Sequence, residues 1–336
     1  MRIYLHGRDN VGWSIDSDRM NTERFLKDIG HVITNNVITA DVVHSVWWNQ
    51  LLEKKYFFLR LKKRIITTAT NNIDPSANPD YKRAKKFVST WVVPNRKQLE
   101  ILKSDNVKAV YQPFYVDEHV FMPLNKTREV LSAELGVDFL SIRDKFLIGS
   151  FQRDTVGSDL KSAKWQKGPE LLVKIVSSLP QREKFVLVLA GPRRHYVISE
   201  CEKLGIPYIF VGHKPKPGID DIDVNTIKVG NMPLLYNFVD CYLMTSRSEG
   251  GPKCVLESSF CKTMIFSTDV GLAPDILDKG SIYTESDCAV ENLSKLIKGE
   301  TSLYSELVPR NYRNAMNICS YEASKKRWKE IYAAFK

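Results

Sequence analysis

Two glutamates in the second half of the sequence flank a Gly-Gly-Pro turn, in the stretch SRSEGGPKCVLE at residues 246–257. The hydrophobic run VDCYLMT directly before it predicts a buried strand. Pro252 suits the first turn of a helix, where its missing N–H leaves no hydrogen bond unmade. The start of that helix offers N–H groups and a positive partial charge, which favour an anionic ligand. We expect Glu249 in a loop and Glu257 about a turn and a half into the helix, on different parts of one extended ligand.

The alternative is a strand, turn and helix whose two glutamates only face solvent. A pair of glutamates at this spacing, taken alone, is compatible with that alternative. The glycines favour the functional interpretation, because Gly250 and Gly251 remove side chains where the backbone meets whatever lies above the strand end.

A second group, at the start of the same half, is suited to binding negative charge. In LIGSFQRDTVGSDLKSAKWQKGPELLVKIV, a strand ends near Ser150, Arg153 follows, and Lys167 with Gly168 opens a helix. A leaving group that carries negative charge needs fixed cations nearby, and an arginine and a lysine supply them without a metal ion. The alternative is that these cations, with two further lysines between them, lie on a solvated loop.

Short Val/Ile-rich runs alternate with amphipathic stretches through the whole chain, which predicts parallel sheets covered by helices on both faces. The expected strands are 2–5, 32–34, 42–44, 64–68, 87–88, 109–111, 146–149, 185–189, 208–211, 226–229, 241–244 and 264–267. The expected helices are 16–28, 48–61, 81–86, 96–103, 169–178, 196–203, 233–239, 254–261, 273–277 and 290–298, with one more at the C-terminus.

The alternation runs through the chain twice, so the fold class is α/β, with two Rossmann-like domains whose parallel sheets face each other across a cleft. We place the first domain at residues 1–143 and the second at residues 144–319. The last segment, residues 320–336, predicts an amphipathic helix that packs back on the first domain. Ligands of such sheets bind at the carboxyl ends of the strands.

Composition narrows the class of protein. A hydrophobic content of 43% and a charged content of 26% over 336 residues are those of a globular protein. The formal net charge of +10 suggests an anionic partner. No apolar run approaches the ~20 residues needed to span a bilayer, and the start MRIYLHG is too short and polar for a signal peptide. The 6 scattered cysteines form no C-x-x-C pair, so we expect a reducing, cytoplasmic compartment and no metal site.

The stretch SRSEGGPKCVLE, with the strand before it and TDVGLAPD after it, resembles the GT-B-fold retaining glycosyltransferases of the group 1 family, marked by an E-x7-E motif (family 4-like). The resemblance implies that Glu249 lies against the transferred sugar and that Glu257 binds the ribose hydroxyls of the nucleotide. It implies that Arg153 and Lys167 clamp the donor diphosphate. Backbone amides after the first glutamate hold donor sugar and phosphate in the family; here these belong to Gly250, Gly251, Lys253 and Cys254, while Pro252 has none to donate.

Weaker matches complete the expected site. LVLAGPRRHY ends a strand at Gly191, where a sugar or base could approach the backbone. IKVGNMPLLYNFVD resembles the base-binding turn of the family and places Val229, Gly230 and Asn231 near the base, with Tyr236 packing behind. An earlier turn at Phe210–Gly212 competes for that alignment.

In the first half, the glycine loop HGRDNVGW makes Gly12 the candidate for close approach to donor and acceptor. His44, at a strand end, either touches substrate or only packs. The stretch WWNQLLEKKYFFLRLKKR combines aromatic and basic residues. It either lies on an anionic membrane, as amphipathic basic helices do, or packs its aromatics on the sheet and turns its lysines to water.

The expected function is a hexosyltransferase that moves a sugar from a nucleotide-diphosphate sugar to a glycan or lipid-linked acceptor, with retention and without a metal or other cofactor. The family suggests polysaccharide or lipid-linked glycan assembly. We expect the cytoplasm from the scattered cysteines, and the basic aromatic stretch allows peripheral contact at the inner face of the membrane. Two alternatives remain open: a sugar-nucleotide epimerase or phosphorylase of the same fold, and a non-catalytic nucleic-acid-binding module. No nucleic-acid reader signature appears, so we expect no nucleic-acid partner.

Overall fold

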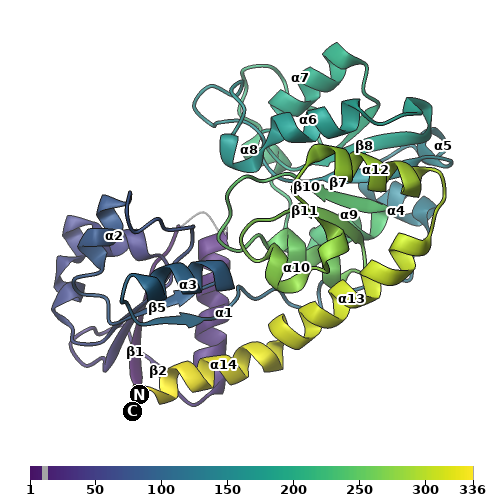
Figure 1. The fold of residues 1–336 in the computed structure, drawn as a ribbon. Helices are drawn as coiled ribbons and strands as arrows, with labels where there is room; N and C mark the ends of the chain where they lie inside the picture. Colours follow the sequence, from purple (N-terminus) through teal and green to yellow (C-terminus); the bar gives the residue numbers. More distant parts are fainter. Residues whose placement is uncertain (10–13, 336) are drawn as a thin grey trace. The chain divides into compact units, whose positions relative to one another are not determined.

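The computed structural model describes residues 1–9 and 14–335 of the chain, which divide into two compact units (Figure 1). The first unit holds Met1–Val116, Glu249–Lys253 and Asn317–Lys336. The second holds Asp117–Ser248 and Cys254–Met316. Each unit contains its own six-stranded parallel sheet, which confirms the predicted α/β class with two Rossmann-like domains.

The sheet of the first unit has the strand order β2-β1-β3-β4-β5-β6, and all its pairs are parallel. Its strands are β1 (Arg2–His6), β2 (Val32–Ile33), β3 (Val42–Ser45), β4 (Ile65–Thr68), β5 (Thr90–Val93) and β6 (Ala109–Tyr111). Its helices are α1 (Ser14–Asp28), η1 (Trp48–Leu52), η2 (Lys54–Leu61), α2 (Pro79–Ala84), α3 (Arg96–Ser104) and α14 (Tyr321–Ala333), η marking 3-10 geometry.

The C-terminal helix α14 packs into the core of this first unit, beside α1 (Figure 1). Trp328, Ile331 and Tyr332 join one hydrophobic cluster with Phe25 of α1 and with strand residues that include Val92. The apolar stripe of the helix therefore supplies one layer over the sheet, as its sequence pattern predicts.

The sheet of the second unit has the strand order β12-β11-β10-β7-β8-β9, again with parallel pairs only. Its strands are β7 (Phe146–Ser150), β8 (Phe185–Ala190), β9 (Tyr208–Val211), β10 (Cys241–Met244), β11 (Met264–Thr268) and β12 (Ile282–Tyr283). Its helices are α4 (Arg128–Leu135), α5 (Phe139–Ile142), η3 (Trp165–Lys167), α6 (Pro169–Ser177), η4 (Arg182–Lys184), α7 (His195–Leu204), α8 (Ile222–Asn225), η5 (Val229–Asn231), α9 (Met232–Phe238), α10 (Lys253–Phe260), α11 (Ala273–Ile276), η6 (Lys279–Ser281), α12 (Ser286–Ile297) and α13 (Ser302–Cys319), of which α10 and α13 each have one end in the first unit.

Strand β8 shows why this sheet is covered on both faces. Its six residues, FVLVLA, are all buried. Phe185, Leu187 and Leu189 join one cluster, while Val186 and Val188 join another. Alternate residues of a strand point to opposite faces, so a continuous apolar run needs a hydrophobic layer on each side.

The boundary between the units differs from the expected one at residues 143–144. Residues 117–143 cluster with the second unit, because α4 and α5 place Leu131 and Ile142 in one of its hydrophobic clusters. Arg128 of α4 also pairs with Asp240 at 2.5 Å. These contacts join residues more than a hundred positions apart, which local sequence patterns do not reveal.

Three expected elements are wrong in type or place. Residues 226–229 form no strand; Val229 instead begins the short helix η5. The expected strand at 87–88 lies a few residues later, at β5. The expected helix at 48–61 is two consecutive 3-10 helices, η1 and η2. Among the residues that the structure describes, no helix is long and apolar enough to cross a membrane.

Candidate functional site

The strand order of the second sheet creates a switch point between β7 and β10. The chain runs from β7 outward to β8 and β9 on one side, and from β10 outward to β11 and β12 on the other. The loops that follow β7 and β10 therefore leave in opposite directions at the carboxyl edge of the sheet. Ligands of open α/β sheets bind at such points.

Side chains and backbone tie these two loops together at the switch point. Gln152, after β7, donates from Nε2 to the carbonyl oxygen of Lys167 at 2.9 Å. Thr245, after β10, donates from Oγ1 to the same oxygen at 3.2 Å, and Ser246 donates to Gln152 Oε1 at 3.1 Å. The N–H of Arg247 donates to the carbonyl of Gln166 at 2.8 Å. Lys167 is therefore held at the strand end beside the loop that leads to Glu249.

Gly168 permits this close approach. Its φ of +56° lies in the left-handed region, and a Cβ at this position would lie 2.0 Å from the carbonyl oxygen of Thr245. It also forms the N-cap of α6, whose first residue is Pro169. The Lys-Gly pair seen in the sequence is thus explained by geometry: only glycine fits where the two loops meet.

We predict that Gly168→Ala destabilises the protein by about 2 kcal/mol or more, because the new methyl group meets both a strained φ and a backbone oxygen. Gly230→Ala is the matched control, since no heavy atom of the described chain lies within 4 Å of a Cβ built there. Urea unfolding of both variants measures the difference. Equal stability of the two variants would contradict the packing of Gly168 against Thr245.

Arg153 and Lys167, the two expected cations, both follow β7 on the side of the loop. Arg153 is partly buried, and burial lowers the pKa of its guanidinium, with Arg193 acting in the same direction and Asp220 opposing. Lys167 ends the short helix η3 and is also partly buried. Both cations thus stand at the carboxyl edge of the sheet, where an anion would meet them.

Glu257 is fixed by a buried tyrosine. The hydroxyl of Tyr236, in α9, donates to Glu257 Oε2 at 2.7 Å. Tyr236 is 1% exposed, and burial raises its pKa well above its usual range, with the charge of Glu257 acting in the same direction. The tyrosine therefore stays a hydrogen-bond donor and holds one carboxylate oxygen in place. The sequence placed Tyr236 behind the base; in the structure its hydroxyl holds Glu257.

Gly191 follows β8 with a φ of +84°, and a Cβ there would come within 3.1 Å of the carbonyl oxygen of Phe151. The ring of Phe151 lies 5.4 Å from that of Tyr236 and 5.2 Å from that of Tyr242. The strand ends β7, β8 and β10 thus meet around a small aromatic cluster under the candidate site.

The two candidate base turns differ in geometry. Val229, Gly230 and Asn231 form the 3-10 helix η5, and Val229 is 60% exposed. Gly212 instead follows β9 directly, with a φ of +124°, and a Cβ there would lie 2.8 Å from Oδ1 of Asn225. The turn at Gly212 is therefore the one that requires a glycine at the carboxyl edge of the sheet.

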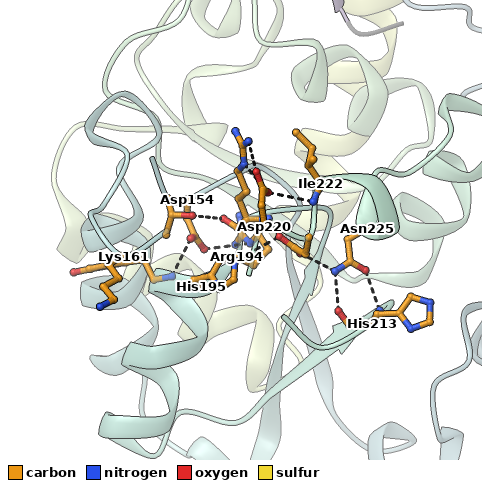
Figure 2. A network of polar contacts seen from close by, with 12 residues as sticks. Asp154, Lys161, Arg194, His195, His213, Asp220, Ile222 and Asn225 are labelled. Carbon is orange, nitrogen blue, oxygen red and sulfur yellow. Dashed lines mark hydrogen bonds and ion pairs between the residues drawn. The ribbon is translucent and has the colours of Figure 1, made fainter. Parts of the chain in front are cut away.

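A polar network, shown in Figure 2, joins the loops after β7, β8 and β9. At its centre, Arg194 and Asp154 are buried, with Nε of the arginine 3.4 Å from Oδ2 of the aspartate. Asp154 also accepts from the backbone N–H groups of Tyr196 and Val197, at 3.1 and 3.3 Å, in the first turn of α7. Arg194 donates to Oγ of Ser150 at 3.1 Å.

Burial raises the pKa of Asp154 to about 6, while Arg194 and the two amides oppose that shift. The network continues from Arg193, whose N–H donates to Asp221 Oδ1 at 2.8 Å, to Asn225, which donates to Asp221 Oδ2 at 2.7 Å. Asn225 also accepts from the N–H of His213 at 2.9 Å (Figure 2). The position of Arg153, next to Asp154 in the chain, therefore depends on buried charges.

The segment Glu249–Lys253 belongs to the first unit. The carbonyl of Gly250 accepts from Nδ2 of Asn95 at 2.6 Å, and a Cβ on Gly251 would meet the ring of Phe114 at 2.5 Å. Lys253 pairs with Asp18 at 2.6 Å. Glu249 is partly buried. Cys254, the second residue of α10, is also partly buried.

Gly12 and His44 are the two candidate site residues from the first half of the sequence. Gly12 lies outside the described residues. His44 is 0% exposed, with Nδ1 2.8 Å from the hydroxyl of Tyr332 and Nε2 3.4 Å from Oγ1 of Thr68. Burial lowers the pKa of His44 to about 3. This geometry favours the packing role that the sequence left open, because a neutral imidazole is enclosed between β3 and α14.

Sequence reasoning missed Gln152, Asp154, Arg194 and Asn225. Two of the signals were present: polar residues directly follow the buried strands in LIGSFQRD and LAGPRRH. What each one contacts depends on the sheet order, which no local pattern gives. Within the described part of the chain, no group of three or more His, Cys, Asp or Glu side chains could hold a metal ion.

Comparisons with known proteins bear on the family and on the fold. Residues 159–312 match the family model of the glycosyl transferases group 1, just under half of the chain. No curated protein matched the sequence.

Solved structures match the fold at low identity. Anabaena HepE, crystallised with UDP and glucose, is similar at TM-score 0.75 and 12% identity, covering 99% of this chain and 100% of HepE. Sucrose-phosphate synthase of Thermosynechococcus elongatus matches at TM-score 0.71 and 12% identity, covering 99% and 98%. A glycosyltransferase from Rickettsia africae matches at TM-score 0.71 and 15% identity, with the same coverage. Residues 159–312 therefore carry the sequence pattern of the group 1 glycosyl transferases, within a chain whose fold is that of the GT-B glycosyltransferases.

Proposed function

We propose that the protein is a retaining glycosyltransferase that takes a sugar from a nucleotide-diphosphate donor without a metal ion. One observation carries the proposal: the region matching the family, residues 159–312, includes Glu257, which Tyr236 holds by a hydrogen bond of 2.7 Å. A fixed carboxylate with one oxygen engaged leaves the other to accept from the paired hydroxyls of a ribose. Anabaena HepE and TarM of S. aureus, two structures of similar fold, were solved with UDP.

Arg153 and Lys167 bind the diphosphate in this proposal. The departing nucleoside diphosphate gains negative charge, and two preorganised cations at the strand ends stabilise it as a metal ion otherwise would. Gln152 and Thr245 support the site by fixing the backbone of Lys167. The turn at Gly212 is the base-contact candidate that the geometry supports best, with the Val229–Asn231 turn as the second.

The reaction is a displacement at the anomeric carbon with retention. The bond from the anomeric carbon to the phosphate oxygen breaks, a bond to the acceptor hydroxyl oxygen forms on the same face, and the departing phosphate takes the acceptor proton. Glu249 lies against the sugar and stabilises the positive charge that develops on the ring. The acceptor is a glycan or a lipid-linked glycan, and the setting is polysaccharide assembly.

A reducing compartment, the cytoplasm, suits this chain. No disulfide joins the cysteines of the described residues. Burial raises the pKa of Cys241 and Cys261 above the usual thiol range, as it does for Cys201, whose pKa is about 12. These three thiols are therefore unreactive and fill space in the core.

Nucleotide binding tests the donor assignment. We expect one of UDP, GDP, ADP, CMP and dTDP to raise the melting temperature, since a ligand at ~100 times its Kd adds about 2.7 kcal/mol. Glu257→Ala is expected to weaken that binding about ten-fold or more, because a charged hydrogen bond to a ribose hydroxyl is worth roughly 1.5–3 kcal/mol. Tyr236→Phe is expected to weaken it less, since it frees the carboxylate without removing it.

Glu300→Gln is the control for charge, because Glu300 is exposed. A protein that no nucleotide stabilises, or a Glu257→Ala variant with unchanged nucleotide binding and lost turnover, would contradict the assignment of Glu257. Product analysis then separates transfer to an acceptor from epimerisation of the donor sugar or phosphorolysis.

A further inference from the structure

The first unit carries exposed apolar side chains on one short segment and the loop tied to it. Phe57 is 60% exposed, Phe58 38% and Leu61 77%, all in the 3-10 helix η2. Ile38, in the loop before β3, is 81% exposed. Lys62 donates from Nζ to the carbonyls of Ile38 and Ala40, both at 2.9 Å, and so fixes this loop beside η2. We call Ile38, Phe57, Phe58 and Leu61 the apolar patch.

The 3-10 geometry of η2 explains why these side chains are outside. A 3-10 helix has three residues per turn, so side chains three apart lie in one row. One row, Tyr56, Leu59 and Lys62, is buried or half-buried. The other two rows carry Phe57, and Phe58 with Leu61, and both are exposed. Only one residue in three can therefore face the core, and the remaining apolar residues must face outward.

The packing alternative holds for only part of this stretch. Trp48, Leu51 and Leu59 are buried at 2% exposure or less, as that alternative requires. Phe57 and Phe58 are exposed to solvent, so packing in the core does not explain why these two positions are aromatic. Exposed apolar residues are ordinary when single, but three of them within residues 57–61, with a fourth in the loop tied to that segment by Lys62, mark an interaction surface.

The basic residues around the apolar patch favour a negatively charged partner. Residues 53–64, EKKYFFLRLKKR, contain six basic residues and one acidic residue. The acidic one, Glu53, pairs with Lys55 at 3.0 Å, while Lys54 and Lys63 are exposed beside the patch. A second copy of the chain would bring like charges together across the patch, so self-association is disfavoured. An anionic bilayer offers both a negative surface and an apolar interior.

We propose that the apolar patch, with Lys54, Lys55 and Lys63, docks the first unit on an anionic lipid bilayer. The patch enters the boundary between head groups and acyl chains, and the lysines stay at the level of the anionic head groups. Such docking would suit a lipid-linked acceptor, but it rests on the surface alone and not on the proposed transfer activity.

The test is co-sedimentation of the full chain with vesicles of phosphatidylcholine and phosphatidylglycerol, compared with phosphatidylcholine alone. We expect binding to the anionic vesicles that weakens as salt rises. The triple variant Phe57→Ser/Phe58→Ser/Leu61→Ser is expected to bind at least about ten-fold more weakly, because three apolar side chains no longer leave water. Lys54→Glu/Lys63→Glu is expected to lose binding to the anionic vesicles without touching the patch.

Val130→Ser/Leu140→Ser is the matched control, since these side chains are 44% and 76% exposed on the second unit. It should bind vesicles like the unchanged protein. No binding to anionic vesicles, or equal loss in patch and control variants, would overturn the proposal. So would concentration-dependent dimerisation that the triple variant abolishes. Nucleotide-dependent melting of the triple variant should be unchanged, which keeps this test separate from that of the donor site.

Discussion

Replacing Glu249 by glutamine is expected to lower kcat for sugar transfer about 10²–10³-fold, the range seen when one preorganised electrostatic group is removed. The glutamine keeps the size of the side chain and removes its charge. If the carboxylate stabilises positive charge on the sugar ring in the transition state, the glutamine variant lacks the negative charge that provides this stabilisation. The melting shift given by nucleotide should persist, because Glu257, Arg153 and Lys167 are untouched.

The structure supports this design because the backbone after Glu249 is fixed. Asn95 is 1% exposed, and its side chain both caps α3 and donates to the carbonyl of Gly250. The Lys253–Asp18 pair holds the other end of the segment, where burial raises the pKa of Asp18 and Lys253 opposes that shift. A neutral side chain at 249 should therefore change chemistry rather than loop position.

Steady-state kinetics with the matching donor measures the effect, with Glu300→Gln as the charge control. A Glu249→Gln variant that keeps more than about one tenth of the kcat would contradict a role in transition-state stabilisation. A loss of nucleotide-dependent melting in the same variant would instead place Glu249 in donor binding.

Much of this fold could be predicted because each buried parallel strand appears in the sequence as a short continuous run of apolar residues. FVLVLA and CYLM are continuous apolar runs, and their burial on both faces requires helices on each side. Glu257 and Gly168 could also be identified from the sequence, since a helix start and a glycine turn are local features. The η2 helix was not, because a 3-10 and an α-helix are hard to distinguish in a short aromatic and basic segment.

The unit boundary and the support of the site are nonlocal. Residues 117–143 join the second unit through contacts such as Arg128 with Asp240, and the loop residues 249–253 join the first. Asp154 and Arg194 meet although forty residues separate them. Pattern and propensity describe a strand and its ends, but they do not say which loop ends become neighbours; the order of strands in the sheet decides that.

The second large effect is expected at that buried pair. Arg194→Met leaves Asp154 buried without its partner, which costs about 3–5 kcal/mol of stability. For a unit of this size, we expect the melting temperature to fall by roughly 6–20 °C. Arg193→Met is the matched control: its arginine is the adjacent residue, and its pair with Asp220, at 2.6 Å, is partly exposed. Exposed pairs contribute only about 0–1 kcal/mol, so the control should change little.

The double variant Asp154→Asn/Arg194→Met isolates the interaction. Removing both charges avoids the lone buried carboxylate, so the double variant should be more stable than the sum of the single losses implies. A coupling of at least about 1 kcal/mol is expected for residues in contact. If Arg194→Met is no more destabilising than Arg193→Met, or if the two substitutions simply add, the pair does not support the site.

The pH dependence supplies an independent check on the same charges. Burial already raises the pKa of Asp154 to about 6, and removing Arg194 takes away the group that opposes this shift. A raised pKa in the folded state means that stability is highest where the carboxyl is protonated in both states and is lost as pH rises through the folded-state pKa. The destabilisation by Arg194→Met should therefore be larger at pH 8 than at pH 5, as urea unfolding measures directly. The double variant has no carboxylate at position 154, so its stability relative to the single variant Asp154→Asn, which also lacks that carboxylate, should not vary over that range.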